Sequence, residues 1–526
     1  MRTISNLLLN QIKVGNRRSV KFPTEDLKDA FEISRKIYLG ESERPYGAAR
    51  GPPGVGKTAV AEAVMVDEKI EKVLRDDHAV FLYEAPTNEL ITSAFERLIS
   101  LTVYDCESAK EFLRTVRLYG SLVPPPFISE TKDELLRECK GITPEMLRDV
   151  ISGRITEDVK IVISTEFQRA SARLKTIRLF YLFVDEASTS PLYLPYTPLS
   201  DIALKNLMEE RRGVLRRLFI VGDERQAIGL EEKYRHSIDL LVLPKIVELL
   251  SREGLLYSNF KHIGITLRLP EPTEKPLHEG FYAPIGGLQA FYKFSVRARE
   301  LRLDSWRDRW GKCGNIELPH KENILNIIQK MLSSEQPLGV INIKESYAAG
   351  ERVEPYRVKV AIGLAALFRC LYPNLNIAMI GPYQDLVLTA KVNYNSKYKQ
   401  YGYVNFSTIN LMLGKEADIV IAVLGKEWYG DEDTPTIYFQ SPNLLNVQFS
   451  RHRAMLIVIG DVVRLRHAAA ASARELGMKG IVEAEGASMI RRTMDMLLTL
   501  AGVEVKSGKT PMWSEGEGGV FLKVVP

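Results

Sequence analysis

Cysteine and histidine are scarce in this chain of 526 residues, which has four cysteines and seven histidines. Cys106, Cys139, Cys313 and Cys370 lie far apart, form no C-x-x-C pair, and have no histidine at zinc-finger spacing. Zinc centres need clustered thiols and imidazoles. We therefore expect neither a zinc centre nor a disulfide framework, and a reducing cell interior is the expected compartment.

Long apolar runs are absent as well. A bilayer-spanning helix needs about 18 or more largely apolar residues, and no run in the chain reaches that length. The first residues, MRTISNLLLNQIKVGNRR, contain only three consecutive leucines, whereas a signal peptide needs a longer apolar block. We expect a soluble intracellular protein with no membrane partner.

Neither sign of charge dominates, because 71 basic and 66 acidic residues leave a formal net charge of +5. This small excess is compatible with a nucleic-acid partner but does not indicate one. The length exceeds what a single core usually serves and predicts about two to four domains.

Short, almost wholly apolar runs recur along the chain with helical patterns between them. The runs are AVFLY (79–83), VKIVI (159–163), LFYLFV (179–184), LFIVG (218–222), LGVINI (338–343), IAMIG (377–381), DIVIAVLG (418–425) and MLIVIG (455–460). Such runs are typical of parallel strands covered by helices on both faces. One group ends before about residue 225 and the other begins after about 335, which predicts an α/β protein with two tandem doubly wound parallel-sheet domains.

The domain boundaries follow from these groups. We place the first domain in 1–258, with a small insertion at about 91–158 where the chain is more charged, and the second domain in 259–470. Helical patterns after residue 461 predict a helical C-terminal extension in 471–526.

The stretch GPPGVGKT (51–58) fits the pattern G-x-x-x-x-G-K-[ST] and precedes a helical pattern with Ala63, Val66, Ile70 and Val73 on one face. Backbone N–H groups of such a loop surround phosphates, its lysine reaches the β- and γ-phosphates, and its hydroxyl ligates Mg²⁺. We expect Thr58 to be a magnesium ligand. The residues expected to bind ATP here are Gly51, Pro52, Pro53, Gly54, Val55, Gly56, Lys57 and Thr58.

Acidic and amide side chains follow two of the predicted strands. In LFYLFVDEAS, Asp185 and Glu186 come at the carboxyl end of a strand, where open α/β sheets bind ligands. We expect Asp185 to hold Mg²⁺ and Glu186 to deprotonate the attacking water. In LFIVGDERQA, Gln226 is placed to sense a γ-phosphate, since an amide both donates and accepts hydrogen bonds.

Taken in order, these motifs resemble those of superfamily 1 helicases, in particular the Upf-like and Sen-like group. The first half follows with GPPGVGKT, APTN (85–88), VIST (162–165), VDEAS (184–188) and GDERQ (222–226). The second half follows with ITLRLPEPTEKPLHEGFY (265–282), IGPYQDL (380–386), STINLMLGKEADIVI (407–421) and NVQFSRHRAMLIVIGD (446–461). The match covers roughly residues 45–90 and 159–461.

The resemblance implies two RecA-like domains with ATP between them and a nucleic-acid strand across both. Arg451 matches the arginine finger and Arg268 the other arginine that reaches the γ-phosphate, a role that can supply several orders of magnitude in rate. Glu416 matches the residue that contacts the ribose, and Arg453 is a reserve candidate for the finger.

The same resemblance implies a set of contacts to the backbone of a single strand, which position the strand without reading its sequence. These residues are Pro86, Thr87, Asn88, Ser164, Thr165, Pro382 and Thr408. Each hydroxyl could instead cap a helix.

Three positions depart from the family pattern. Leu267 stands where an aromatic residue stacks on adenine, no glutamine lies in PTEDLKDAFEISRK (23–36) to read the base edge, and Lys415 replaces an arginine. We therefore expect ATP to be replaceable by GTP, CTP or UTP. Trp306 and Trp310, interleaved with arginines, either grip a strand or, as is commoner at this spacing, pack in a core.

The expected function is an NTP-dependent helicase or translocase moving on single-stranded DNA or RNA, 5′ to 3′ if the resemblance holds for direction. The alternative is an NTP-switched clamp that remodels a nucleoprotein without unwinding. A small-molecule kinase is a third reading, but the pair Asp185–Glu186 and an arginine finger argue against it.

Overall fold

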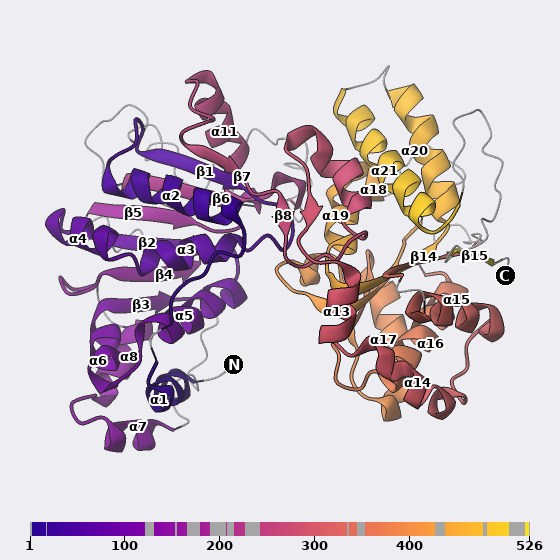
Figure 1. Ribbon diagram of the computed structural model, residues 1–526, viewed down its shortest axis with the longest axis horizontal. Helices are drawn as coiled ribbons and strands as arrows, with labels where there is room; N and C mark the ends of the chain where they lie inside the picture. Colours follow the sequence, from indigo (N-terminus) through magenta and orange to yellow (C-terminus); the bar gives the residue numbers. More distant parts are fainter. Residues whose placement is uncertain are drawn as a thin grey trace. The chain divides into compact units, whose positions relative to one another are not determined.

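The computed structural model describes residues 3–16, 18–120, 131–152, 155–165, 179–189, 207, 215–226, 242–333, 336–343, 353–426, 437–476, 481–503 and 521–524. The chain divides into two compact units, one of Met1–Gly51 with Val55–Ile263 and the other of Pro52–Gly54 with Gly264–Pro526 (Figure 1). The boundary between residues 263 and 264 lies within five residues of the expected one.

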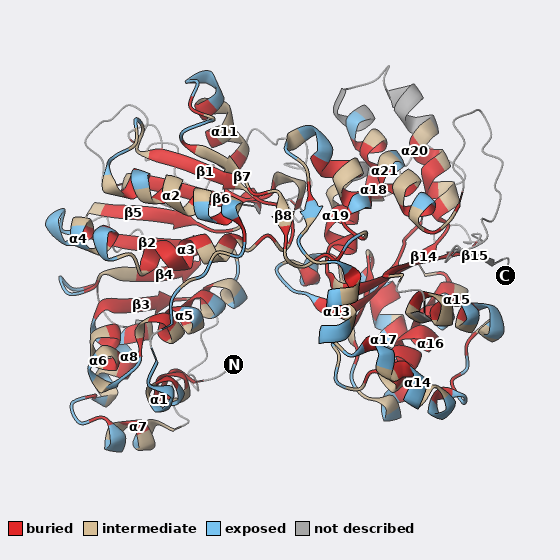
Figure 2. Ribbon diagram, in the orientation of Figure 1, coloured by how far each residue is buried: buried red, intermediate tan, exposed pale blue. Residues whose placement is uncertain are grey.

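The first unit is built on a seven-stranded, all-parallel sheet in the order β3-β4-β2-β5-β6-β1-β7. Its strands are β1 (Tyr46–Arg50), β2 (Ala79–Ala85), β3 (Val116–Tyr119), β4 (Ile161–Thr165), β5 (Leu179–Val184), β6 (Leu215–Gly222) and β7 (Phe260–His262). The central strands are buried along their length (Figure 2), which is why they read as apolar runs without alternation.

Helices accompany this sheet, and several of them pack directly against its strands. They are α1 (Ile4–Val14), α2 (Glu25–Leu39), α3 (Lys57–Met65), α4 (Glu68–Asp76), α5 (Asn88–Thr102), α6 (Cys106–Thr115), α7 (Lys132–Glu138), α8 (Pro144–Ser152) and α11 (Val242–Arg252), with short 3₁₀ turns η2 (Ala187–Thr189) and η3 (Glu224–Gln226). Close packing explains the small residues of β1, because a Cβ on Gly47 would lie 2.4 Å from Ile37 Cδ1 of α2 and 2.6 Å from the Asn259 carbonyl.

The second unit holds a six-stranded parallel sheet in the order β12-β11-β13-β14-β10-β15 and a two-stranded parallel ribbon of β8 and β9. The strands are β8 (Ile265–Thr266), β9 (Gln289–Ala290), β10 (Leu338–Ile343), β11 (Ile377–Gly381), β12 (Asn405–Thr408), β13 (Ala417–Val423), β14 (His452–Gly460) and β15 (Phe521–Val524).

Ten α-helices are described in the second unit. They are α12 (Lys275–Leu277), α13 (Phe294–Glu300), α14 (Trp306–Arg309), α15 (Lys321–Ser333), α16 (Pro355–Leu371), α17 (Gln384–Tyr398), α18 (Ile437–Gln440), α19 (Asn443–Phe449), α20 (Val462–Leu476) and α21 (Ile481–Leu500). A π-helical turn, η6 (His278–Tyr282), packs so closely on α21 that a Cβ on Gly280 would lie 1.9 Å from Thr493 Oγ1. The segment expected to be a separate extension from residue 471 therefore contributes α21 to the second unit.

All eight apolar runs overlap strands, with VKIVI and DIVIAVLG each extending two residues beyond theirs, so the α/β class with two parallel sheets is confirmed. The helix after the glycine-rich loop is shorter than expected: α3 ends at Met65, and Asp67 caps a new helix, α4, by accepting from the backbone N–H of Ile70. The expected insertion at about 91–158 is also partly wrong, because it supplies the edge strand β3; its residues 121–130 lie outside the described part of the chain.

The expectation of no disulfide framework was wrong. Cys106 is bonded to Cys139, joining α6 to the end of α7, and Cys313 is bonded to Cys370 of α16. Of the tryptophan pair, Trp306 belongs to the packed interior: it is 8% exposed, and its ring meets that of the half-buried Trp310 edge to face, with centroids 5.4 Å apart.

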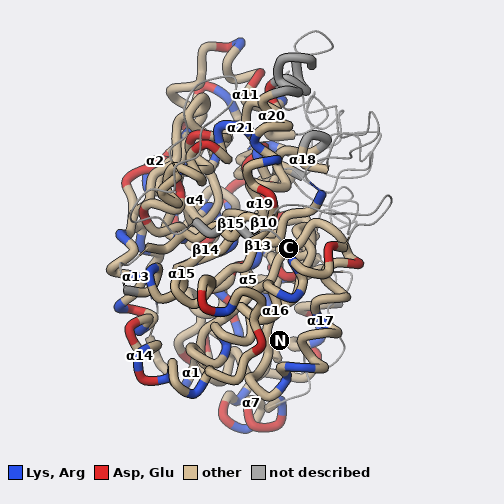
Figure 3. Tube along the Cα trace, turned by 90° about the vertical axis from the view of Figure 1, so that its right-hand side faces the viewer, with Lys and Arg blue, Asp and Glu red and all other residues tan. Residues whose placement is uncertain are grey.

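Basic and acidic residues are interspersed along the described trace (Figure 3), in keeping with the small net charge. Among the described helices, none combines the length and the apolar character that a bilayer crossing requires.

Candidate active site

The glycine-rich loop follows β1, which lies between β6 and β7. Gly54 and Gly56 have φ values of 74° and 90°, a backbone conformation that side chains disfavour. Gly51 is constrained by space, since a Cβ there would lie 2.6 Å from Val55 Cγ2. Gly56 directly precedes α3, so the loop delivers the chain into a helix N-terminus, where backbone N–H groups are available to an anion.

Lys57, the first residue of α3, is buried with its ammonium group turned back over the loop. Its Nζ donates to the Gly51 carbonyl at 2.9 Å and lies 3.6 Å from Glu186 Oε1. A cation held over a ring of backbone donors suits a polyanionic ligand.

Asp185, directly after β5, is the centre of the acidic side of the site. Its Oδ2 accepts hydrogen bonds from Thr58 Oγ1 and from Tyr83 OH, both at 2.9 Å. Its Oδ1 accepts from the backbone N–H of Glu186, also at 2.9 Å. The carboxylate is thus held in one orientation against the first turn of α3.

The pKa of Asp185 is raised to about 6, mainly by burial and also by the nearby Glu186 charge, against the opposing effect of Lys57 and the two hydroxyls. A cation placed here would favour the charged carboxylate.

The donor set fits Mg²⁺. Thr58 and Asp185 offer hard oxygen ligands side by side, and Mg²⁺ is usually held by one or two such groups together with substrate phosphates and waters. In the described part of the chain, no group of three or more His, Cys, Asp or Glu side chains that could hold a metal ion occurs.

Glu186 has a φ of 52°, uncommon for a residue with a side chain. Such backbone outliers cluster at functional sites. The side chain is about one quarter exposed, so this carboxylate is open to solvent where Asp185 is not. Of the two carboxylates, it is the one that can contact a water molecule.

Gln226 lies in the 3₁₀ turn after β6, and β6 is the neighbour of β1. Its Nε2 donates to Asp223 Oδ2 at 2.7 Å. The same turn is joined to the end of β1 by an ion pair between Arg50 and Glu224 at 2.6 Å. The loop, the Asp185–Glu186 pair and Gln226 all follow the carboxyl ends of parallel strands, and these ends lie at one edge of the sheet.

The first-unit residues expected to contact a strand are less uniform. Thr87 is exposed and caps α5 by accepting from the backbone N–H of Leu90 at 3.4 Å. Ser164 and Thr165 end β4 at the same sheet edge, but both are buried, at 0% and 2% exposure. In the described state their side chains therefore do not face solvent, and Pro86, Thr87 and Asn88 are the more accessible part of the set.

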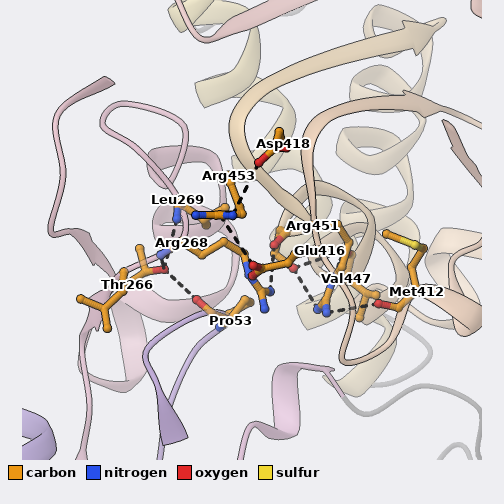
Figure 4. Close-up of polar contacts among 12 residues, drawn as sticks. Pro53, Thr266, Arg268, Leu269, Met412, Glu416, Asp418, Val447, Arg451 and Arg453 are labelled. Carbon is orange, nitrogen blue, oxygen red and sulfur yellow. Dashed lines mark hydrogen bonds and ion pairs between the residues drawn. The ribbon is translucent and has the colours of Figure 1, made fainter. Parts of the chain in front are cut away.

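In the second unit, Arg268 and Glu416 form an ion pair with 2.9 Å between Nε and Oε2 (Figure 4). Arg268 also donates to the Ser450 carbonyl at 3.2 Å. Arg453 approaches Glu416 at 3.6 Å and Asp418 at 3.6 Å. Glu416 thus holds two arginines of which Arg453 is one third exposed.

The guanidinium of Arg451, the expected arginine finger, is hydrogen-bonded to groups within the second unit itself. Arg451 is 1% exposed, and its guanidinium donates to the carbonyls of Val447 at 2.9 Å and Met412 at 3.5 Å and to the Ser450 hydroxyl (Figure 4). Arg451 is therefore held inside the second unit at the end of α19. The guanidinium groups of Arg268 and Arg453 lie around Glu416 instead. The expected finger, Arg451, is thus the more buried of the two arginines, and the reserve candidate, Arg453, is the more exposed.

The site residues expected in the second unit lie at two opposite edges of its six-stranded sheet. Glu416 directly precedes β13 and Arg451 directly precedes β14, whereas Pro382 directly follows β11 and Thr408 ends β12. Since all these strands are parallel, the two groups lie at opposite edges of one sheet. Thr408 caps no described helix, so the capping alternative is wrong for this residue.

Sequence reasoning missed Tyr83, whose hydroxyl reaches Asp185, because a tyrosine in an apolar strand carries no motif. It also missed the contact of the loop with β8, in which Thr266 Oγ1 donates to the Pro53 carbonyl at 2.8 Å and Leu267 N–H to the Gly54 carbonyl at 2.9 Å. The position of ITLR next to Gly54 was not readable from spacing.

No model of a known protein family matches the chain, and no match to a curated protein was found.

Proposed function

We propose that the protein is an NTP hydrolase with two RecA-like domains that couples Mg²⁺-dependent hydrolysis of ATP, or of another NTP, to movement on single-stranded nucleic acid. The observation that carries the hydrolase part is the convergence of Lys57, Thr58, Asp185 and Glu186 at the carboxyl edge of the first sheet. The nucleic-acid part rests on the order of the motifs.

The chain's own residues have distinct parts in this proposal. The loop from Gly51 to Gly56 binds the β-phosphate through backbone N–H groups, and Lys57 neutralises the β- and γ-phosphates. Mg²⁺, when bound, would be held by Thr58 and, through water, by Asp185, and would neutralise charge on the phosphates. Glu186 orients the attacking water and takes its proton.

The second unit supplies the cations. We propose that Arg268 and Arg453 act on the γ-phosphate, because Glu416 holds both and Arg453 is accessible. Arg451 takes this part only if its guanidinium leaves the Val447 carbonyl. An arginine presented to a transferring phosphoryl group is worth several orders of magnitude in rate.

The test is steady-state NTP hydrolysis by the wild type and by Glu186→Gln, without nucleic acid and with single-stranded DNA or RNA. We expect hydrolysis that one polymer stimulates many-fold and that the variant lacks. Absence of hydrolysis under every condition would refute the hydrolase, and rates indifferent to both polymers would refute the coupling.

Two activities would remain to be separated once stimulation is seen. A helicase unwinds a tailed duplex steadily while NTP lasts, whereas an NTP-switched clamp binds and releases the strand without unwinding. A duplex with a single-stranded 5′ tail, compared with one carrying a 3′ tail, also tests the expected direction.

A further inference from the structure

A cavity of about 530 Å³ lies in the second unit, among the segment that precedes α15 and the helices α16 and α17. Its lining includes the buried side chains of Ile316, Ile362 and Tyr398. The volume is in the range of pockets that hold small molecules. None of the described residues that line this cavity belongs to the phosphate-binding loop or to the set expected to contact a strand.

Three lysine side chains line the cavity, each from a different helix. Lys321 begins α15, Lys359 lies in the second turn of α16, and Lys397 lies in the last turn of α17. Among the described lining residues, the one carboxylate is that of Glu317. Three separate helices thus give the cavity an excess of positive charge.

Most of this charge is not neutralised by a neighbouring carboxylate. Lys321 donates to the Gly314 carbonyl, which is uncharged. In the part of the chain that the structure describes, Lys359 makes no hydrogen bond or ion pair. Lys397 approaches Glu317 at 3.7 Å, but Glu317 is 82% exposed, so water screens this pair. Like charges around one cavity repel each other, and an anion among them relieves that repulsion.

The wall of the cavity is fixed before any ligand binds. Cys313 is bonded to Cys370, which ties the start of the wall to α16. The Tyr398 hydroxyl donates to the Glu317 carbonyl at 2.8 Å, and a Cβ on Gly363 would lie 3.0 Å from the same carbonyl. Because the wall is held at these points, a ligand does not have to order it, which lowers the entropic cost of binding.

The cavity is remote from the second-unit residues expected to contact a strand. Helix α17 begins two residues after Pro382, and its 15 residues span about 22 Å. Lys397 and Tyr398 therefore lie at the far end of this helix from Pro382. An anion in the cavity and a strand at Pro382 would occupy different places on the second unit.

We propose that this cavity binds a small phosphorylated anion that carries at least two phosphate groups. Lysine binds phosphate as a point charge, and its three N–H donors can turn toward any phosphate oxygen. Carboxylates are better matched by the planar fork of arginine, and no arginine is among the described residues that line the cavity. The inference uses residues of the second unit alone and does not rest on the proposed NTP hydrolysis.

The test is the dissociation constant of inorganic pyrophosphate, measured by calorimetry on the full chain at low ionic strength without divalent cations. Lys359→Met removes the charge, keeps the aliphatic stem and changes an exposed residue. It should weaken binding about tenfold, as loss of one charged hydrogen bond does, and Lys397→Met should also weaken it. Both variants are measured with Lys57 intact and in Lys57→Ala, which lacks the cation of the phosphate-binding loop; the loss should be the same in both.

Lys391→Met is the matched control, because Lys391 is an exposed lysine of α17 that does not line the cavity; it should leave pyrophosphate binding unchanged. Equal binding by Lys359→Met and its parent would overturn the inference. A loss that appears only while Lys57 is intact would also overturn it, since the loop would then be the site. Citrate bound as tightly as pyrophosphate would overturn the assignment to phosphate.

A single-stranded oligonucleotide is titrated in the same way. Lys359→Met should leave its affinity within about twofold, because one exposed charge contributes little to binding elsewhere on the surface. A tenfold loss of oligonucleotide binding, with pyrophosphate binding unchanged, would assign these lysines to a nucleic-acid strand and overturn the inference.

Discussion

Gly54 and Arg268 lie so close that a Cβ added to the glycine would be 2.3 Å from the Cβ of the arginine. Gly54 also has a φ of 74°, so two independent constraints favour glycine there. One belongs to the loop's own backbone and the other to the β8 segment that follows it.

Gly54→Ala should therefore destabilise the protein and weaken NTP binding. The left-handed backbone costs roughly 1–2 kcal/mol for a residue with a side chain, and the displaced Arg268 adds to that cost. Gly254→Ala is the matched control, because Gly254 has the same φ of 74° but open space around it. Urea unfolding and nucleotide titration of both variants measure the difference; equal losses of stability with unchanged NTP binding would contradict the steric constraint.

Tyr83→Phe should weaken the response to Mg²⁺. The variant loses the hydroxyl that donates to Asp185 but keeps the ring, which stacks on Phe183 with centroids 6.2 Å apart. Loss of a residue that orients a metal ligand costs about 10–100-fold in metal affinity in other proteins. The measurement is the Mg²⁺ concentration at half-maximal hydrolysis.

Tyr38→Phe serves as its control, since Tyr38 is also buried but its hydroxyl donates to the Leu182 carbonyl at 2.7 Å. If both variants need the same Mg²⁺ concentration as the wild type, Tyr83 has no part in orienting Asp185.

Arg451→Ala should mainly lower the stability of the protein, whereas Arg453→Ala should mainly lower kcat. Arg451 is buried with hydrogen bonds to two carbonyls, so its loss should lower the free energy of unfolding by about 3 kcal/mol, as for other charge-assisted hydrogen bonds. Arg453 is partly exposed, so Arg453→Ala should change stability by less than about 1 kcal/mol while lowering kcat. Wild-type kcat in Arg453→Ala would return the finger role to Arg451.

His452→Gln should make the protein more resistant to acid. His452 is fully buried against Thr273, at 2.7 Å, and burial lowers its pKa to about 3. The unfolded chain takes up the proton near pH 6.5 and the folded chain does not, so the histidine's contribution to stability is full above pH 6.5 and falls as the pH drops toward 3. By pH 4 this loss amounts to about 3 kcal/mol.

The measurement is the difference in free energy of unfolding between variant and wild type, which should rise by that amount from pH 7 to pH 4. The difference is used because a second group titrates in this range: burial raises the pKa of Glu274, the residue after Thr273, to about 7. The contribution of this carboxyl to stability has the opposite pH dependence, since it is full below pH 4.5 and is lost as the pH rises through 7. Glu274→Gln should accordingly show a difference that rises with pH. A flat difference for His452→Gln would mean that the histidine is not held neutral.

Reduction should destabilise the chain. The two disulfides join residues separated by 33 and 57 positions, and a chain-entropy estimate gives about 4 kcal/mol for each loop. The measurement is the melting temperature with and without reductant, together with the mass after alkylation under non-reducing conditions, which should show no modified thiol. Cys106→Ser with Cys139→Ser, already unbridged, should lose less on reduction. Four reactive thiols in the folded protein would refute the pairing.

The strands that are covered on both faces of the sheet could be predicted from the sequence, because burial on both sides requires a continuous run of apolar residues. The run LFYLFV coincides with β5 and LGVINI with β10. Strand β1 escaped this reasoning because its residues, YGAAR, are small where α2 and the Asn259 backbone approach. The edge strands β3 and β12 are only four residues long, too short for a pattern.

Local motifs indicated the loop and the acidic pair, since their chemistry depends on adjacent residues. Contacts between distant segments were not predictable in the same way. The pairing of Cys313 with Cys370 and the burial of Arg451 depend on how helices pack, which spacing along the chain does not encode.

In the second unit, Glu416 directly precedes β13 and Arg453 is the second residue of β14, whereas Pro382 directly follows β11 and Thr408 ends β12. The sheet between them is a hydrogen-bonded slab about 20 Å long, as follows from the rise of its strands. We expect such a sheet to move as a rigid body, so that a displacement at Glu416 is transmitted to Pro382 and Thr408 almost undiminished. A cross-link that immobilises the residues at the amino edge of this sheet should therefore also stop motion at its carboxyl edge, although the cross-link contacts no residue there.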